Sequence, residues 1–344
     1  MEQSVSTGID VLPDKAGLFP GFSLMSFSVH ERARVGLLLD GVLHDLCLIA
    51  QSLQVAVVEG SPCFGILDIL ADWDRAFERL QLMVSRASKV GLEPALSPIN
   101  DASFRVLAPV PKPGKMIHAA QNYSDHVEEM RHARVFGFND SETDPNTDFT
   151  GDRATTRPYL FLKAPSCVTG PYDEVIIPPE VTQMDWEVEL AVVIGRKAKR
   201  VKAGDALNHV AGYMTINDFS ARNLLFRPDR DRLRSDWFGG KSHDGFAPMG
   251  PVLMPAAFVP DHRSLPLRLS VNGEVKQDGN TSGLIYSAEE QIEFASAMTT
   301  LEPGDVLATG TPGGVGQGSN NFLKSGDLVE AEVEGIGVLR NRVI

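Results

Sequence analysis

The chain has 344 residues, of which 43% are hydrophobic and 22% are charged, and its formal net charge is −13. A chain of this length usually exceeds what one hydrophobic core serves, so we expect two unequal domains. The acidic balance disfavours a nucleic-acid or anionic-membrane partner, although it leaves room for a local basic pocket. Three unpatterned cysteines, no long apolar run and no signal-peptide pattern predict a cytoplasmic protein without a membrane partner.

The first third of the chain has the pattern of a small α+β unit. Asp40-Gly41 lies between two apolar runs and predicts a hairpin with a type I′ turn. Apolar residues recur at helical spacing over residues 65–90, which predicts one amphipathic helix. A cluster of prolines at 108–114 then interrupts the pattern. We therefore expect a small N-terminal α+β domain over residues 1–110.

Residues 111–344 are expected to form a mostly β domain, because strand-like runs dominate them. These runs are Lys115–Ala119, Tyr159–Leu162, Glu187–Ile194, Val210–Ile216, Leu267–Val271, Val306–Thr309 and Leu328–Val333. Asn272-Gly273 indicates a second hairpin, and Ser287–Met298 has a helical pattern that opens with a capping sequence. The polar stretch Phe136–Thr156 is typical of a mobile loop.

Three carboxylates in neighbouring strand-like runs suggest a metal site. Alternate residues of a strand share a face, so Glu187 and Glu189 are expected to point the same way, about 7 Å apart. Asp218 ends the next run. Carboxylate oxygens favour a hard ion, with Mg²⁺ first and then Mn²⁺ or Ca²⁺. Two other interpretations remain open: a solvated face of an edge strand for the Glu-x-Glu pair, and a helix N-cap for Asp218.

Acid/base chemistry is suggested by His126 and Glu129, which share a face if their segment is helical. A carboxylate beside an imidazole fixes its tautomer, as a general base that activates water requires. Lys241 follows two glycines and is suited to hold a substrate carboxylate, and the glycine-rich loop around Thr311 is suited to hold an anion. An exposed helix pair, a solvated lysine and a plain turn are the ordinary alternatives. The chain lacks the Gly-x-Ser-x-Gly elbow of many serine hydrolases.

Six motifs occur in an order that resembles the fumarylacetoacetate hydrolase superfamily, most closely its acylpyruvate hydrolase and oxaloacetate decarboxylase-like branch. They are Asn122-Tyr123-x-x-His126-x-x-Glu129, Tyr159-Leu160-Phe161-Leu162-Lys163, Glu187-x-Glu189, Asn217-Asp218-Phe219-Ser220-Ala221-Arg222, Gly240-Lys241-Ser242 and Thr309-Gly310-Thr311-Pro312-x-Gly314-Val315-Gly316. The resemblance covers about residues 113–344. It implies a β-roll of the family's C-terminal type, usually paired into homodimers, with a small N-terminal domain.

The resemblance also implies residue roles. The implied metal ligands are Glu187, Glu189 and Asp218, with Mg²⁺ or Mn²⁺ as the ion and Ca²⁺ as a possibility in crystals. The implied catalytic residues are His126, Glu129 and Lys241. The implied substrate contacts are Tyr123, Arg222, Gly310 and Thr311. The chain departs from many relatives at Leu225, where they place a substrate-contacting glutamine, and its polar loop looks longer.

These roles lead to an expected function. We expect a metal-dependent hydrolase of acylpyruvate-like 2,4-dioxo acids, in which His126 activates water that attacks the 4-oxo carbon and expels the enolate of pyruvate. Decarboxylation of a 2-oxo acid and isomerisation of an unsaturated 2-oxo diacid use the same site chemistry. A binding protein that has lost catalysis is a further alternative, suggested only by Leu225.

Overall fold

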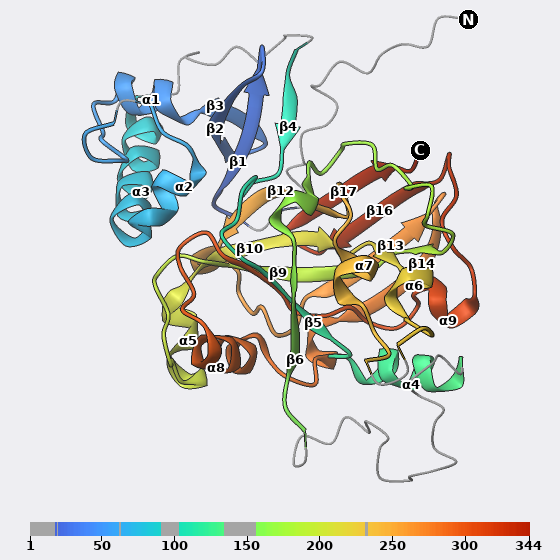
Figure 1. The fold of residues 1–344 in the computed structure, drawn as a ribbon. Helices are drawn as coiled ribbons and strands as arrows, with labels where there is room; N and C mark the ends of the chain where they lie inside the picture. Colours follow the sequence, from blue (N-terminus) through green and yellow to red (C-terminus); the bar gives the residue numbers. More distant parts are fainter. Residues whose placement is uncertain (1–17, 19, 62, 91–102, 134–155, 231–232) are drawn as a thin grey trace, which may run out of the picture.

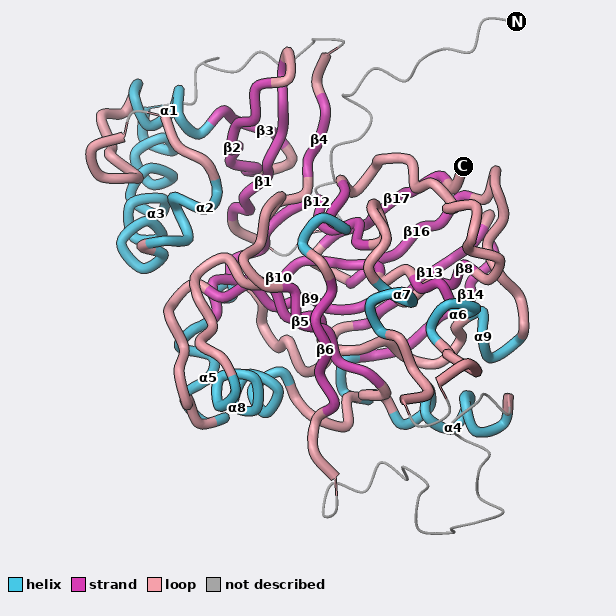
Figure 2. Tube along the Cα trace, viewed as in Figure 1, coloured by secondary structure: helices cyan, strands magenta, loops and turns pink. Residues whose placement is uncertain are grey.

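The computed structural model describes residues 18, 20–61, 63–90, 103–133, 156–230 and 233–344. Its strands are β1 (Phe22–Val29), β2 (Arg32–Leu39), β3 (Val42–Asp45), β4 (Arg105–Leu107), β5 (Met116–Ala120), β6 (Tyr159–Lys163), β7 (Val168–Thr169), β8 (Met184–Asp185), β9 (Val188–Ile194), β10 (Val210–Asn217), β11 (Ser220–Ala221), β12 (Ala247–Pro255), β13 (Pro266–Val271), β14 (Glu274–Asn280), β15 (Val306–Ala308), β16 (Leu328–Val333) and β17 (Gly337–Arg342). Its helices are α1 (Leu46–Ser52), α2 (Ile66–Ala71), α3 (Trp73–Val90), α4 (Ser124–His132), α5 (Ala203–Ala206), α6 (Arg222–Leu225), α7 (Trp237–Lys241), α8 (Ala288–Met298) and α9 (Gly316–Ser319). The expected mostly β, α+β class is confirmed (Figures 1 and 2).

One large sheet runs through the molecule in the order β3-β2-β1-β12-β10-β9-β15-β5-β6. The N-terminal strands join it where β1 pairs with β12, through Leu24 and Leu253. Strand β9 lies in the interior of this sheet, between β10 and β15, and every residue in it is buried. The edge-strand interpretation of Glu187 and Glu189 is therefore wrong.

A second sheet, β14-β13-β16-β17, covers one face of the large sheet and completes the expected β-roll. Strands β13 and β16 contact β9, and β16 and β17 contact β10. Between the sheets lies an apolar core that includes Leu190 and Val192 of β9 and Leu269 and Ala331 of the second sheet. Because successive side chains of a strand point to opposite faces, every second residue of β9 points into this core.

The opposite face of the large sheet packs against the N-terminal helices. Ala191 and Val193 of β9 share a second core with Leu70 of α2 and Trp73 of α3. The helical pattern of residues 65–90 is confirmed, but the chain forms two helices because Asp72 between them leaves helical geometry (φ −137°, ψ 60°). Figure 1 shows these helices beside β1–β3.

Both predicted hairpin turns are confirmed. Asp40 and Gly41 have φ of 52° and 80°, and Asn272 and Gly273 have φ of 53° and 80°, as a type I′ turn requires. The capping sequence of α8 is also confirmed, since Ser287 and Glu290 exchange side-chain and backbone hydrogen bonds. The predicted polar loop falls almost entirely outside the described residues. None of the described helices combines the length and hydropathy that a membrane crossing needs.

Candidate functional site

The three carboxylates meet because of the register between β9 and β10. Asn217 pairs with Val188, so Asp218 lies directly opposite Glu187, and the Asp218 N–H donates to the Glu187 carbonyl at 2.8 Å. Glu189 is two residues further along the same face. All three side chains are buried. The N-cap interpretation of Asp218 is wrong, because α6 begins four residues later with Ala221 as its N-cap.

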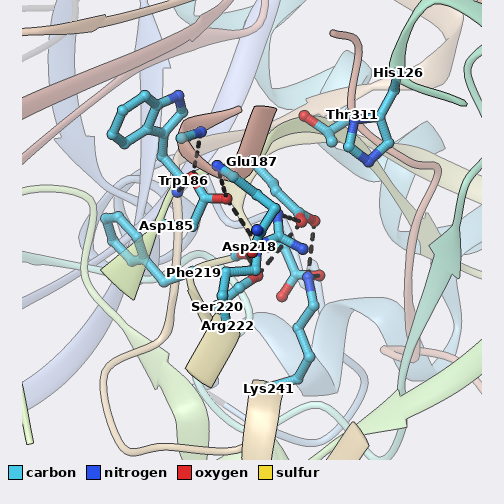
Figure 3. A network of polar contacts seen from close by, with 12 residues as sticks. His126, Asp185, Trp186, Glu187, Asp218, Phe219, Ser220, Arg222, Lys241 and Thr311 are labelled. Atoms are coloured by element: carbon cyan, nitrogen blue, oxygen red, sulfur yellow. Dashed lines mark hydrogen bonds and ion pairs between the residues drawn. The ribbon is translucent and has the colours of Figure 1, made fainter. Parts of the chain in front are cut away.

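Two lysines and an arginine pair with Glu187 and Asp218, and Figure 3 shows Lys241 and Arg222 of these beside the two carboxylates. Lys241 Nζ lies 2.8 Å from both Glu187 Oε2 and Asp218 Oδ2. The buried Lys163 ammonium donates to Asp218 Oδ1 at 2.5 Å and to two backbone carbonyls. Arg222 Nη2 donates to Glu187 Oε1 at 2.5 Å. The structure thus brings the predicted Lys241 and Arg222 into the same cluster as the predicted metal ligands.

The cluster gives its carboxyl groups opposite pKa shifts. Burial alone raises the pKa of Asp218, but Lys163 and Lys241 outweigh burial and hold it well below 3.8. Burial also raises the pKa of Glu187, but the charges of Lys241 and Arg222 outweigh it, so the pKa of Glu187 is lowered. For Glu189, burial and then the charges of Asp218 and Glu187 raise the pKa well above 4.5. Glu189 is therefore the carboxyl group whose charge is least compensated.

Arg222 is held by a carboxylate that the sequence interpretation did not select. Arg222 Nε donates to Asp185 Oδ2 at 2.7 Å. Asp185 also accepts the backbone N–H groups of Gly316 (2.6 Å) and Gln317 (3.0 Å), which ties it to the glycine-rich loop. Because Asp185 has several donors of its own, it fixes the guanidinium that reaches Glu187. In the sequence, only the position of Asp185, two residues before Glu187 of the Glu-x-Glu motif, indicated that it belongs to the site.

The donor set fits a divalent cation. Glu189 Oε2 accepts the Gly310 N–H at 2.6 Å, but Glu189 Oε1 is buried and has no hydrogen-bond partner among the described residues. His118, Glu189 and Asp218 each offer one ligand atom, and these atoms lie within 4.8 Å of one another. Buried polar atoms are rarely left unpaired, and a bound ion would satisfy this oxygen. Glu187, the third expected ligand, is not one of these three residues. The Lys241 ammonium links it to Asp218, because it lies 2.8 Å from a carboxylate oxygen of each.

The predicted acid/base pair also forms. His126 Nδ1 lies 3.4 Å from Glu129 Oε2, and both residues are on α4. The Gly314 N–H donates to both oxygens of Glu129 at 3.0 Å. That contact orients the carboxylate toward the imidazole, so Glu129 can hold one tautomer of His126.

One cavity of about 250 Å³ reaches His126 of the pair and Glu187, Arg222 and Lys241 of the charged cluster. Its polar lining residues include His126, Glu187, Arg222, Lys241, Thr311 and Gln317, and its apolar ones include Phe161, Leu225, Phe226 and Trp237. This volume is below the 300–1,000 Å³ of pockets that bind drug-sized ligands, so it suits a small acid. Leu225, where the family resemblance implies a glutamine, contributes to the apolar wall.

The remaining predicted substrate contacts have other visible partners. Thr311 lines the cavity, but its hydroxyl donates to the Val188 carbonyl at 2.9 Å and accepts from Gln277 at 2.8 Å. The N–H of Gly310 is engaged by Glu189. The Tyr123 ring is buried in the core between the sheets and is not among the residues that line the cavity.

This fold and this site define a β-roll protein with a buried carboxylate cluster facing an imidazole, and comparison with known proteins identifies its family. The fumarylacetoacetate hydrolase C-terminal family matches residues 115–344. The chain therefore belongs to the fumarylacetoacetate hydrolase family, as the motifs implied.

Two curated relatives carry the same activity name. The chain is 40% identical over 265 residues to the human protein named "Oxaloacetate tautomerase FAHD2A, mitochondrial", covering 76% of each chain. It is 36% identical over 321 residues to "Oxaloacetate tautomerase YisK" of Bacillus subtilis, covering 92% of this chain and 97% of that one. Since the human relative's name places it in mitochondria, a cytoplasmic location stays a prediction.

Solved structures of the family share the fold. The fumarylacetoacetate hydrolase from Exiguobacterium antarcticum matches with a TM-score of 0.69 and 31% identity, over 94% of this chain and 99% of that chain. A maleylpyruvate hydrolase from Sphingobium matches with a TM-score of 0.67 and 27% identity, over 94% and 99% of the two chains. The family thus includes proteins named for tautomerisation and for hydrolysis.

Proposed function

We propose that this protein is a divalent-metal-dependent tautomerase of a small 2-oxo diacid such as oxaloacetate, which moves a proton at the carbon beside the 2-oxo group. The observation that carries the proposal is that His126 lines the same small cavity as Glu187, Arg222 and Lys241. The names of the curated relatives support tautomerisation as the reaction type. The expected hydrolysis of acylpyruvates becomes the second candidate.

Each residue type has a defined task in this reaction. Glu187, Glu189 and Asp218 would hold Mg²⁺ or Mn²⁺, which supplies Lewis-acid stabilisation of negative charge on the substrate oxygens. His126 takes the proton from carbon and returns it to oxygen, while Glu129 keeps the imidazole in one tautomer. Moving one proton leaves the number of atoms unchanged and needs no water.

Substrate binding is assigned to the cationic and polar side of the cavity. Lys241 and Arg222 place positive charge beside the carboxylate cluster, and a substrate carboxylate there would gain charge-assisted hydrogen bonds. Thr311 lines the same region, and Gly310 acts through Glu189. Tyr123 is proposed to support this wall from the core behind it. Phe161 and Trp237 stack on one another and exclude water from the opposite side.

The test is the rate of conversion between the keto and enol forms of oxaloacetate, followed by the enol absorbance with added Mg²⁺ or Mn²⁺. His126→Asn is expected to reduce this rate by at least 10²-fold, as loss of a general acid/base does. His209→Asn is the matched control; this half-buried histidine before β10 does not line the cavity, and its replacement is expected to leave the rate unchanged. Equal rates for His126→Asn and the unsubstituted protein would contradict the proposal.

Carbon-carbon hydrolysis remains a second candidate because the His126–Glu129 pair has the arrangement that activates water. Acylpyruvates with Mg²⁺ are then expected to lose their diketone absorbance and release pyruvate. Glu129→Gln separates the two reactions, since hydrolysis should collapse while tautomerisation is much less affected. A decarboxylase would instead release CO₂ from oxaloacetate. A binding protein without catalysis would bind an oxo acid in the presence of metal and turn over none of these acids.

A further inference from the structure

Two cysteines of the N-terminal part, Cys47 and Cys63, lie side by side although they are 16 residues apart in the chain. Their Sγ atoms are 3.8 Å from one another. Cys47 belongs to α1, and its thiol also donates to the Phe64 carbonyl at 3.7 Å, so it points toward the segment that carries Cys63. No motif relates the two positions in the sequence, and the fold alone brings them together.

Neither packing nor metal binding explains this pair. A buried cysteine commonly acts as a small hydrophobic side chain, which accounts for Cys47 in the core beneath the N-terminal helices. Cys63 is exposed, so core packing does not account for it. Among the residues that the structure describes, no third histidine, cysteine or carboxylate forms a group of metal-site spacing with the two thiols. The chemistry that two neighbouring thiols share is oxidation to a disulfide.

The geometry allows a disulfide bond to form after a small movement. The sulfur atoms of a disulfide are about 2.0 Å apart, so the two Sγ atoms need to approach by about 1.8 Å from their present 3.8 Å. Cys63 lies in the irregular segment just before α2, which can shift without breaking a strand or a helix. Cys167, the remaining cysteine of the sequence, is buried instead beside the Lys241 carbonyl, at 3.9 Å.

The surroundings give the two thiols different parts in such a reaction. Burial, above all, raises the pKa of Cys47 to about 11, so this thiol stays protonated near neutral pH and is inert toward reagents in solution. Cys63 is open to solvent. A cavity of about 340 Å³ along α1 includes Ser61 and Phe64 in its lining, which leaves room for a small reagent next to the Cys63 segment. Cys63 is therefore the thiol that a reagent meets first.

We infer that Cys63 is a site of thiol–disulfide exchange and that Cys47 resolves it, so that small-molecule disulfides such as oxidised glutathione convert the pair into a reversible disulfide bond. The Cys63 thiolate attacks one sulfur of the reagent, forms a mixed disulfide and releases one thiolate. Cys47 then gives up its proton and attacks the Cys63 sulfur, which releases the second thiolate. Two protein thiols lose two electrons and two protons, and the reagent is reduced to two thiols.

The bond fastens α1 to the segment before α2, and thiol reductants reverse it because exposed disulfides are the labile ones. This inference does not depend on the proposed function.

Mass spectrometry of the folded, full-length protein after treatment with oxidised glutathione tests the inference. The unsubstituted protein is expected to lose the mass of two hydrogen atoms and to keep no adduct, and peptide mapping should place the bond between Cys47 and Cys63 with Cys167 unmodified. Cys47→Ser should instead retain one glutathione on Cys63, because the resolving thiol is missing. Cys63→Ser, the matched control at the exposed position, should acquire neither an adduct nor a bond.

A stable glutathione adduct on the unsubstituted protein, the absence of any reaction, or a bond between two chains would each overturn the inference. Thermal unfolding supplies a second readout. The bond closes a loop in the unfolded chain, so the oxidised protein should melt a few degrees above the reduced one, whereas Cys63→Ser should melt equally in both conditions. Equal melting temperatures for the two forms of the unsubstituted protein would contradict the fastening of α1. Circular dichroism shows whether Cys47→Ser remains folded, and Cys47→Ala is the alternative if it does not.

Discussion

The charge of Glu189 sets a pH dependence in the metal-free protein. Its folded-state pKa lies well above 4.5, so the folded protein keeps a proton that the unfolded chain releases. Stability is therefore lost as pH rises from about 4.5 through the folded pKa. Glu189→Gln removes this cost and is expected to raise the melting temperature near neutral pH, with no gain below about pH 4.

Glu187→Gln is the matched comparison, because the pKa of Glu187 is shifted downward. This carboxylate stabilises the fold above its unfolded pKa, and its loss leaves Lys241 with Asp218 and Arg222 with Asp185 as their remaining carboxylate partners. We expect a lower melting temperature near neutral pH. Thermal unfolding of both variants with a chelator, followed by circular dichroism across pH, checks the two signs. Shifts of the same sign would show that the charge distribution described here is wrong.

The sequence predicted those residues whose proximity follows from consecutive segments. Glu187 and Glu189 are two residues apart, and Asp218 ends the next strand, so an ordinary hairpin-like pairing brings them together. His118 and Lys163 approach the same carboxylates from β5 and β6, across β15. In that order β15 lies between β9 and β5, and it is more than 100 residues from either of them along the chain, so spacing in the sequence does not encode the arrangement.

At the scale of single elements, the two predicted turns depend on glycine. Gly273 has a φ of +80°, yet a Cβ there would meet nothing within 4 Å. Gly273→Ala is thus expected to cost only the backbone strain of the left-handed region, about 1–2 kcal/mol of unfolding free energy. Gly204 in α5 also has open space but no positive φ, so Gly204→Ala should stabilise by about 0.4–1 kcal/mol.

Chemical denaturation of both glycine variants, compared with the unsubstituted protein, measures these differences. A loss at Gly204 as large as that at Gly273 would mean that something other than φ governs both positions. The elements themselves were predictable where an apolar, β-forming run was nearly continuous, as in β9 and β10. The break at Asp72 was not, because the apolar spacing of α2 continues into α3 and conceals the change in backbone angle.

At the scale of the whole molecule, the N-terminal helices and the central sheet share one core. Leu70 is fully buried in this core, while its neighbour Leu67 faces Gly304, in the turn before β15. Leu70→Ala should therefore cost about 2–5 kcal/mol, and it should shift the unfolding of the entire protein rather than a separate N-terminal step. Leu67 of the same helix is 39% exposed, so Leu67→Ala is a milder control.

Tryptophan fluorescence and far-ultraviolet circular dichroism of Leu70→Ala, recorded during the same urea titration, check this expectation. Two separated transitions would indicate that residues 1–110 unfold on their own, as a strictly independent domain does. The sequence suggested such independence through the prolines near residue 110. The pairing of β1 with β12 and the shared core, both long-range features, argue for coupling.

The lysines around the carboxylates also determine the order in which the metal ion and the substrate bind. Asp185, Glu187, Glu189 and Asp218 face Lys163, Arg222 and Lys241, and a proton on Glu189 leaves this group close to neutral. A dication held by these carboxylates would favour the ionised form of Glu189 and would make the group positive. A dianionic acid then experiences net attraction only at the loaded centre, so metal entry should precede substrate entry in every catalytic cycle that starts from the bare protein.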